Sequence, residues 1–189
     1  MKHPHVAIEE TQIPQAVEAA FQHAVDTYAS EINKLIAVWQ RFADEDLEYR
    51  PHPKSSTVGE IVKHELLSAR RFFGEFLQGP EPDAGVVLPQ PMTMEACCER
   101  LRLMARKRLE FLASRSQEWW LEDVHFFDVK RQRSWIFWRR VLHTAHHRTQ
   151  LTMYLRLLDR PVPSVYGPTS DETWTGADPT HTAEASARR

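Results

Sequence analysis

The sequence predicts an all-α protein, a four-helix up-down bundle with proline-rich connecting loops. Four segments repeat their apolar residues at steps of three and four, which is the spacing of one face of an α-helix. No segment of comparable length alternates apolar and polar residues, so the sequence has almost no strand signal. The 189 residues fit one domain, which we place at residues 1–168.

The first two predicted helices are delimited by a proline-containing turn and a capping motif. Apolar periodicity covers residues 13–42 and stops before a Tyr-Arg-Pro-His-Pro segment, whose prolines force extended or turn geometry. The second helix begins at a capping box, in which Thr57 and Glu60 satisfy each other's free backbone donors. Its apolar stripe continues to Phe76 and ends at a Gly-Pro pair.

The third and fourth predicted helices follow the same pattern. The third starts after Thr93 as N-cap and extends to Arg115. The fourth runs from Ser134 to Leu158 and ends before two prolines. Loops of about fifteen residues precede the second and third helices, which leaves room for a connection that crosses the bundle.

Two segments are predicted to lie outside the long helices. Residues 117–133 are rich in Trp and Phe, but neither helical nor strand periodicity is clean, so we interpret them as a connector. Its aromatic rings suit core packing, and a substrate pocket or a dimer face is the alternative. Residues 169–189 contain few apolar side chains to offset their ordering entropy, which predicts a flexible C-terminal tail.

Composition narrows the class of protein. The net charge of -2 supplies no basic field, so a nucleic-acid partner is not expected. The chain has neither a run of about 18 apolar residues nor a signal-peptide pattern, so we expect no membrane association and a cytoplasmic location. Cys97 and Cys98 are adjacent, cannot form an unstrained disulfide and are interpreted as small core residues.

The histidines carry the chemical signal. His143 and His147 are four residues apart, so both lie on one face of the fourth helix, where two imidazoles can reach one metal ion. A chain with ten histidines contains such a pair about 0.5 times by chance, so the spacing alone is weak evidence. His64 borders the apolar stripe of the second helix and is the candidate third ligand. The alternative is a set of half-buried histidines bonded to neighbouring side chains.

The chain resembles a known family in three segments. These are a Tyr-Arg-Pro turn followed by His64 in His-Glu-Leu-Leu, the HTAHHRTQ sequence from His143 to Gln150, and a final Pro-Val-Pro-Ser-Val-Tyr-Gly-Pro segment. Over residues 15–168 this pattern is similar to the DinB/YfiT-like superfamily of metalloenzymes. One departure is Thr149, where the family usually has Gly.

The resemblance implies a four-helix bundle with a divalent metal ion, often nickel, zinc or iron. Carried over position by position, the metal ligands are His64, His143 and His147. The resemblance also implies a homodimer and, from relatives such as thiol-dependent S-transferases and a mycothiol-dependent isomerase, a low-molecular-weight thiol that reacts with an electrophilic substrate. Activation of water is the enzymatic alternative.

A non-catalytic reading also stands beside the enzymatic ones. The protein would then be a metal-binding or dimeric scaffold of a stress response, in which the ion ties two helices together. An exchangeable fourth ligand is expected for an enzyme and is unnecessary for a scaffold. No catalytic residue is assigned from the sequence.

The sequence allows more than one role for several residues near these histidines. His146 is expected at the surface or behind a ligand, and Arg148 and Gln150 either orient a ring, bind an anionic group or lie at the surface. Glu65 follows His64 but points about 100° away from it, so it is predicted to be a poor partner for the site and a doubtful general base. His52, between two prolines, is expected in an exposed turn.

Overall fold

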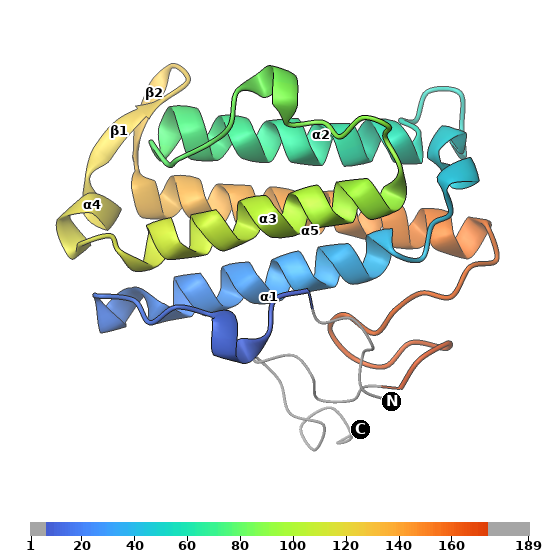
Figure 1. Cartoon of the computed structure of the whole chain (residues 1–189), viewed down its shortest axis with the longest axis horizontal. Coiled ribbons are helices and arrows are strands. Elements are labelled where there is room, and N and C mark those ends of the chain that lie inside the picture. Colours follow the sequence, from blue (N-terminus) through green and yellow to red (C-terminus); the bar gives the residue numbers. More distant parts are fainter. Residues whose placement is uncertain (1–6, 174–189) are drawn as a thin grey trace.

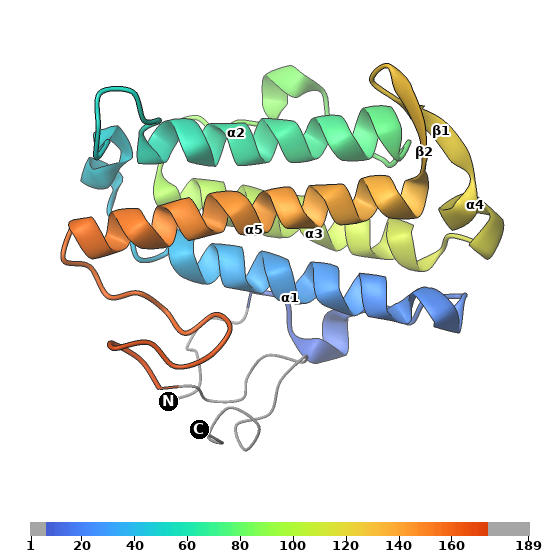
Figure 2. The same ribbon diagram turned by 180° about the vertical axis from the view of Figure 1, so that it is seen from behind.

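A computed structural model describes residues 7–173 as a bundle of four long helices (Figure 1). The long helices confirm the all-α class and are α1 (Gln22–Trp39), α2 (Val58–Arg71), α3 (Met94–Ala113) and α5 (Arg133–Leu157). Helices α1 and α5 run in one direction and α2 and α3 in the other (Figures 1 and 2). The segment between α2 and α3 therefore returns along the bundle, which is the crossing connection that the loop length allowed.

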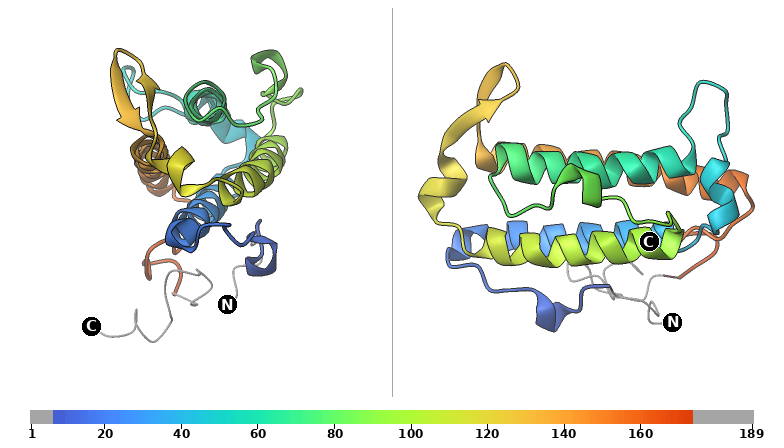
Figure 3. Two further views of the ribbon diagram at one scale, coloured as in Figure 1. Left: turned by 90° about the vertical axis from the view of Figure 1, so that its left-hand side faces the viewer. Right: turned by 45° about the horizontal axis from the view of Figure 1, so that its top comes forward.

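The four helices surround the core in a fixed order. Viewed from the end, α2 is followed by α5, then α1, then α3 (Figure 3). The returning segment, with its short 3-10 turn Ala84–Val86, lies beside α2 and α3 (Figure 3). As a result α2 packs on α5, and this pair of helices carries the candidate site.

Helix α1 begins later than the predicted residue 13. Pro14 lies in the stretch before it, and a 3-10 turn, Ala19–Phe21, leads into the helix at Gln22. The Gln22 side chain accepts a hydrogen bond from the Ala16 N–H at 2.6 Å and donates to the Pro14 carbonyl at 3.3 Å. Those bonds hold the preceding segment outside the helix, although its apolar residues have helical spacing.

The helix starts at α2 and α3 follow the predicted caps. Thr57 accepts a hydrogen bond from the Glu60 N–H at 3.0 Å, and the Glu60 carboxylate accepts one from the Thr57 N–H at 2.7 Å. Thr93 caps α3 through the N–H of Ala96 at 3.2 Å. Helix α2 continues into a π-helical turn, Phe72–Phe76, as its apolar stripe predicted.

The segment predicted as a plain connector is more regular than expected. It forms a short helix, α4 (Gln117–Leu121), and an antiparallel hairpin of β1 (Asp123–Phe126) and β2 (Val129–Gln132), in which Phe126 pairs with Val129. The two-residue turn places Phe127 at φ 54°. Such turns usually carry Asn or Gly at this conformation, so the sequence lacked the ordinary hairpin signal.

The core is aromatic and aliphatic, and it includes both cysteines. Trp39 and Trp120 are among the largest fully buried side chains, so at least part of the aromatic connector packs in the core. Cys97 and Cys98 are buried on α3, as predicted. Burial raises the pKa of the Cys97 thiol to about 11 and that of Cys98 to about 12, so neither is a ready nucleophile.

The first residues of the predicted tail are ordered against the bundle. The carboxylate of Asp171 pairs with Arg156 at 2.6 Å, and Glu172 pairs with Arg41. The rest of that tail, from residue 174, lies outside the described residues. Within residues 7–173, none of the helices combines the length and hydropathy that a membrane span requires.

Candidate metal centre

The structure brings the three histidines named from the sequence together between α2 and α5. His64 projects from α2, while His143 and His147 project from successive turns of α5, and the two helices lie side by side (Figure 2). The ring centroid of His64 lies 5.1 Å from that of His143 and 4.8 Å from that of His147. One potential ligand atom from each of these residues and from Glu65 lies within 4.8 Å of the others.

The spacing of the ring nitrogens fits a single ion. The Nε2 atoms of His64 and His143 lie 3.3 Å apart. Two nitrogens bound at about 2.0–2.1 Å to one tetrahedral ion are separated by about 3.3–3.4 Å. The residues present therefore fit a divalent cation of the zinc type.

The cluster lies at the edge of the bundle. The His64 side chain is exposed, and the His143 side chain is 21% exposed. Partial burial is the largest cause that lowers the pKa of His64 and of His147, and the neighbouring His143 lowers both further. The two rings therefore stay neutral, the form that binds metal, to a lower pH than ordinary histidines do.

Gln150 orients one of the rings. Its Oε1 lies 2.7 Å from His147 Nδ1, so this nitrogen carries a proton and donates it to the amide oxygen. The lone pair of His147 then lies on Nε2, the nitrogen available to an ion. Of the roles open for Gln150, the structure supports orientation of a ring.

The prediction for Glu65 was wrong. The side chain lies at the interface with α5, where its Oε1 is 3.2 Å from His143 Nδ1 and its Oε2 is 2.6 Å from Arg140. Burial would raise the pKa of this carboxyl, but Arg140 and His143 outweigh burial and hold the pKa at about 2. Glu65 is therefore an ionised, buried partner of the histidine cluster.

Arg148 is not a residue of the site or of the surface. Its side chain is 2% exposed and points to α1, where Nη1 donates to the Glu31 carboxylate at 2.5 Å. His146 and His52 are exposed, as predicted. The role of Arg148 is to join two helices of the bundle on the side away from α2.

An aromatic wall adjoins the cluster. The Phe72 ring is stacked on the His143 ring with centroids 6.4 Å apart, and Phe126 of the hairpin packs on Phe72 at 5.6 Å. The exposed Phe127 lies 5.0 Å from Phe76 on the same side. Phe72, in the π-helical turn that continues α2, therefore links the histidine cluster to the aromatic rings of the hairpin.

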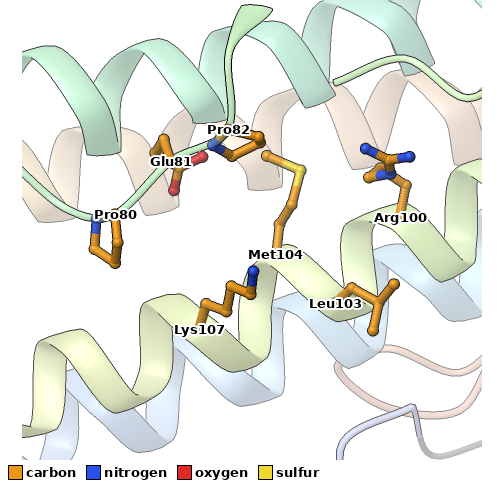
Figure 4. Close-up of a pocket in the computed structure, with 7 residues that line it drawn as sticks. All are labelled: Pro80, Glu81, Pro82, Arg100, Leu103, Met104 and Lys107. Carbon is orange, nitrogen blue, oxygen red and sulfur yellow. The ribbon is translucent and has the colours of Figure 1, made fainter. Parts of the chain in front are cut away.

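A hollow of about 370 Å³ lies elsewhere on the bundle, between residues 80–82 and α3 (Figure 4). The Glu81 carboxylate at its edge is paired with Arg108 through two bonds of 2.6 and 2.7 Å. No residue of the histidine cluster lines this hollow, which is formed by Pro80, Glu81, Pro82, Arg100, Leu103, Met104 and Lys107.

The fold and the site place this chain among helical-bundle proteins in which histidines from the second and the last long helix form a candidate metal centre. The chain belongs to the DinB family, whose model matches residues 15–181. A crystal structure of a DinB-like protein from Bacillus cereus is similar over 80% of this chain and 99% of that one, with 20% identity and a TM-score of 0.67. A DinB-like protein from Bacillus subtilis, also 20% identical, is similar over 76% and 96% of the two chains with a TM-score of 0.55. No curated protein matches the chain.

Proposed function

We propose that this DinB-family protein holds one divalent cation, nickel, zinc or iron, through His64, His143 and His147. The observation that carries the proposal is the 3.3 Å approach of two Nε2 atoms from different helices at an accessible edge of the bundle. Three protein ligands leave a fourth position of a tetrahedral ion open, which is the arrangement of catalytic sites.

We further propose that the protein is an enzyme of the S-transferase type, which joins a low-molecular-weight thiol to an electrophilic substrate. A cation at this site would supply the Lewis acidity that lowers the pKa of a thiol or of water. Both cysteines of the chain are buried with raised pKa values, so the sulfur nucleophile has to come from a small molecule. The chain's own contribution is to orient the histidine rings and to leave one side of the cluster open. Activation of water is the second reaction that the same site permits.

Elemental analysis tests the metal site. Protein purified without an affinity tag is expected to contain about one metal per chain, or to take up one from nickel, zinc or iron. The His64→Ala variant and the His143→Ala/His147→Ala variant should lose it, whereas His125→Ala, which removes an exposed histidine outside the cluster, should keep it. Equal metal content in all four proteins would contradict the site.

Cobalt substitution separates an enzyme from a non-catalytic scaffold. If a fourth ligand is exchangeable, a small thiol added to the cobalt-loaded protein binds at the open position and changes its visible spectrum. A closed, structural site gives the same spectrum with and without thiol. That second result would favour the scaffold, in which the ion only ties α2 to α5.

We also propose that the protein is a homodimer. The outer face of α5 is not covered by another helix (Figure 2), and it exposes Leu142, Met153 and Leu157 by 63%, 58% and 57%. Apolar residues gathered on one helix face favour association. Sedimentation should give a dimer that Leu142→Glu/Met153→Glu converts to a monomer, and a monomeric wild type would contradict the proposal. The cytoplasmic location and the role in stress response stay predictions.

A further inference from the structure

The Glu65 carboxylate lies directly behind the histidine cluster and has one oxygen without an assigned donor. Its side chain is 1% exposed, and Oε2 accepts a hydrogen bond from Arg140 at 2.6 Å. Oε1 is buried and makes no hydrogen bond within residues 7–173, although His143 Nδ1 lies 3.2 Å away, close enough to donate after a small rotation of its ring. A buried carboxylate oxygen left without a donor is costly, so this contact decides where the ring proton of His143 lies.

His143 Nδ1 has two neighbours that require opposite tautomers. Arg140 Nη1 lies 2.8 Å from it and can only donate, which would place the ring proton on Nε2. Glu65 Oε1 can only accept, which places the proton on Nδ1 and leaves the Nε2 lone pair facing His64. Only the second tautomer lets Nε2 bind a cation.

The rest of the network favours the second tautomer. Arg140 donates to Ser68 Oγ at 3.0 Å, to Glu65 Oε2 at 2.6 Å and to the Glu65 carbonyl at 3.4 Å, so it does not depend on the ring nitrogen. Glu65 Oε1 has no such substitute. Each tautomer leaves one of these groups unpaired, but Arg140 keeps three other hydrogen bonds whereas Oε1 has none, so a His143 ring that donates from Nδ1 to Glu65 leaves the less costly group unpaired.

We propose that Glu65 is a positioning residue, which accepts the Nδ1 proton of His143 and so directs the Nε2 lone pair of that ring towards the cation. The inference deepens the proposed function and rests on it only for the identity of the cation site. The carboxylate has a second effect, because its negative charge offsets the Arg140 guanidinium beside an ion that is itself positive.

The Glu65→Gln variant reverses both effects. The amide is close in size to the carboxylate, but its NH₂ group can donate to Nδ1 and so favour a proton on Nε2. The variant also leaves the positive charge of Arg140 without its counter-charge. We expect nickel and zinc affinity to fall about 10- to 100-fold, which is the range for a lost partner of a metal-binding histidine.

The matched control is Glu81→Gln. Glu81 is also a buried carboxylate, with its side chain 3% exposed, and it is paired with Arg108 far from the histidines in the hollow beside α3. This substitution removes a buried ion pair of the same kind, so it reproduces the loss of stability without touching a ligand. Its metal affinity should equal that of the wild type.

Two measurements test the inference. Nitrogen NMR of the metal-free wild type, with the His143 signals assigned by their loss in His143→Gln, should show Nδ1 protonated and Nε2 bare. Calorimetry with nickel and with zinc should then show weak binding by Glu65→Gln and unchanged binding by Glu81→Gln. A proton on Nε2 in the wild type, or wild-type affinity in Glu65→Gln, would overturn the role of Glu65.

The design separates this inference from the proposed function. If the wild type binds neither nickel, zinc nor iron, the proposed function fails, while the tautomer of the metal-free protein still shows whether Glu65 accepts the Nδ1 proton of His143. If Glu65→Gln does not fold, the wild-type tautomer decides it as well, because that measurement needs no change at Glu65.

Discussion

Replacement of Arg148 by Met should destabilise the bundle without removing the metal. The substitution keeps an unbranched apolar stem but removes the guanidinium, which is paired at 2.5 Å with Glu31 in an environment where the two side chains are 2% and 6% exposed. Glu31 then keeps two partners, Lys34 at 3.0 Å and the Tyr166 hydroxyl at 2.7 Å. The buried carboxylate is therefore only partly uncompensated in the variant.

The expected loss of unfolding free energy follows from the contacts that Glu31 keeps. Removal of one partner of a buried pair costs about 3–5 kcal/mol, and the two remaining contacts of Glu31 place the loss near the lower end, at about 3 kcal/mol. For a chain of this size about 1 kcal/mol corresponds to about 2–4 °C in Tm, so the midpoint should fall by about 6–12 °C. The double variant Glu31→Gln/Arg148→Met removes both charges and should lose less than the two single variants together.

Thermal unfolding followed by circular dichroism measures these shifts, and elemental analysis of the same proteins measures the metal. Arg139→Met is the matched control, since Arg139 is an exposed arginine on the same helix. It should leave Tm within about 2 °C of the wild type, as surface substitutions usually do. An equally small shift of Tm in Arg148→Met would refute the reasoning, and so would a double variant whose loss of stability equals the sum of the two single losses. Loss of metal in Arg148→Met would show that Arg148 contributes to the metal site.

Three further predictions concern pH, reactivity and packing. Metal binding should be constant above pH about 6.5 and weaken as the pH falls, because the ligand rings must be neutral to bind. The lowered pKa values of His64 and His147 shift this loss to lower pH. Full metal content at pH about 5, measured by equilibrium dialysis, would contradict a three-histidine site. Both cysteines, with pKa values raised by burial to about 11 and about 12, should react with a thiol reagent at pH about 8 only after denaturant unfolds the chain, and rapid labelling of the native protein would count against their burial. Gly59→Ala should lower the free energy of unfolding by about 1–3 kcal/mol, because the added Cβ would lie 3.0 Å from the Leu47 carbonyl oxygen. The control Gly85→Ala places its Cβ where nothing lies within 4 Å, so it should be neutral or slightly stabilising. Equal urea midpoints for the two variants would disprove the close approach at Gly59.

Local signals in the sequence predicted the long helices well. The capping box at Thr57 and the cap at Thr93 lie where hydroxyl groups bond free backbone donors, which depends only on residues three apart. The start of α1 was predicted too early, because apolar spacing continues through a segment that Pro14 and the Gln22 side chain hold outside the helix. The hairpin was missed because its turn uses Phe127 at φ 54°, a residue that carries no turn signal.

The part of the candidate site that depends on spacing within one helix was also predicted from the sequence. The four-residue spacing of His143 and His147 is a property of one helix, and His64 was named because it borders the apolar stripe of the second helix, a choice that the family resemblance supported. Glu65 was rejected on the angle between neighbours of α2, but its partners belong to α5, so no argument within one helix could find it. A buried carboxylate next to a histidine on an apolar stripe was the only available signal.

The sequence by itself determined the helical class and most helix boundaries, because periodicity and caps are short-range properties of the backbone, and it named three histidines that the structure brings together. The tertiary structure decided the direction of each helix, the pairing of α2 with α5, and the partners of every buried charge. It placed Glu65 against His143 and Arg148 against Glu31, two ion-pair networks that a helix-by-helix reading could not assign. The physical reason is that a buried charge needs a partner from whichever helix packs beside it, and only the packed bundle specifies that neighbour.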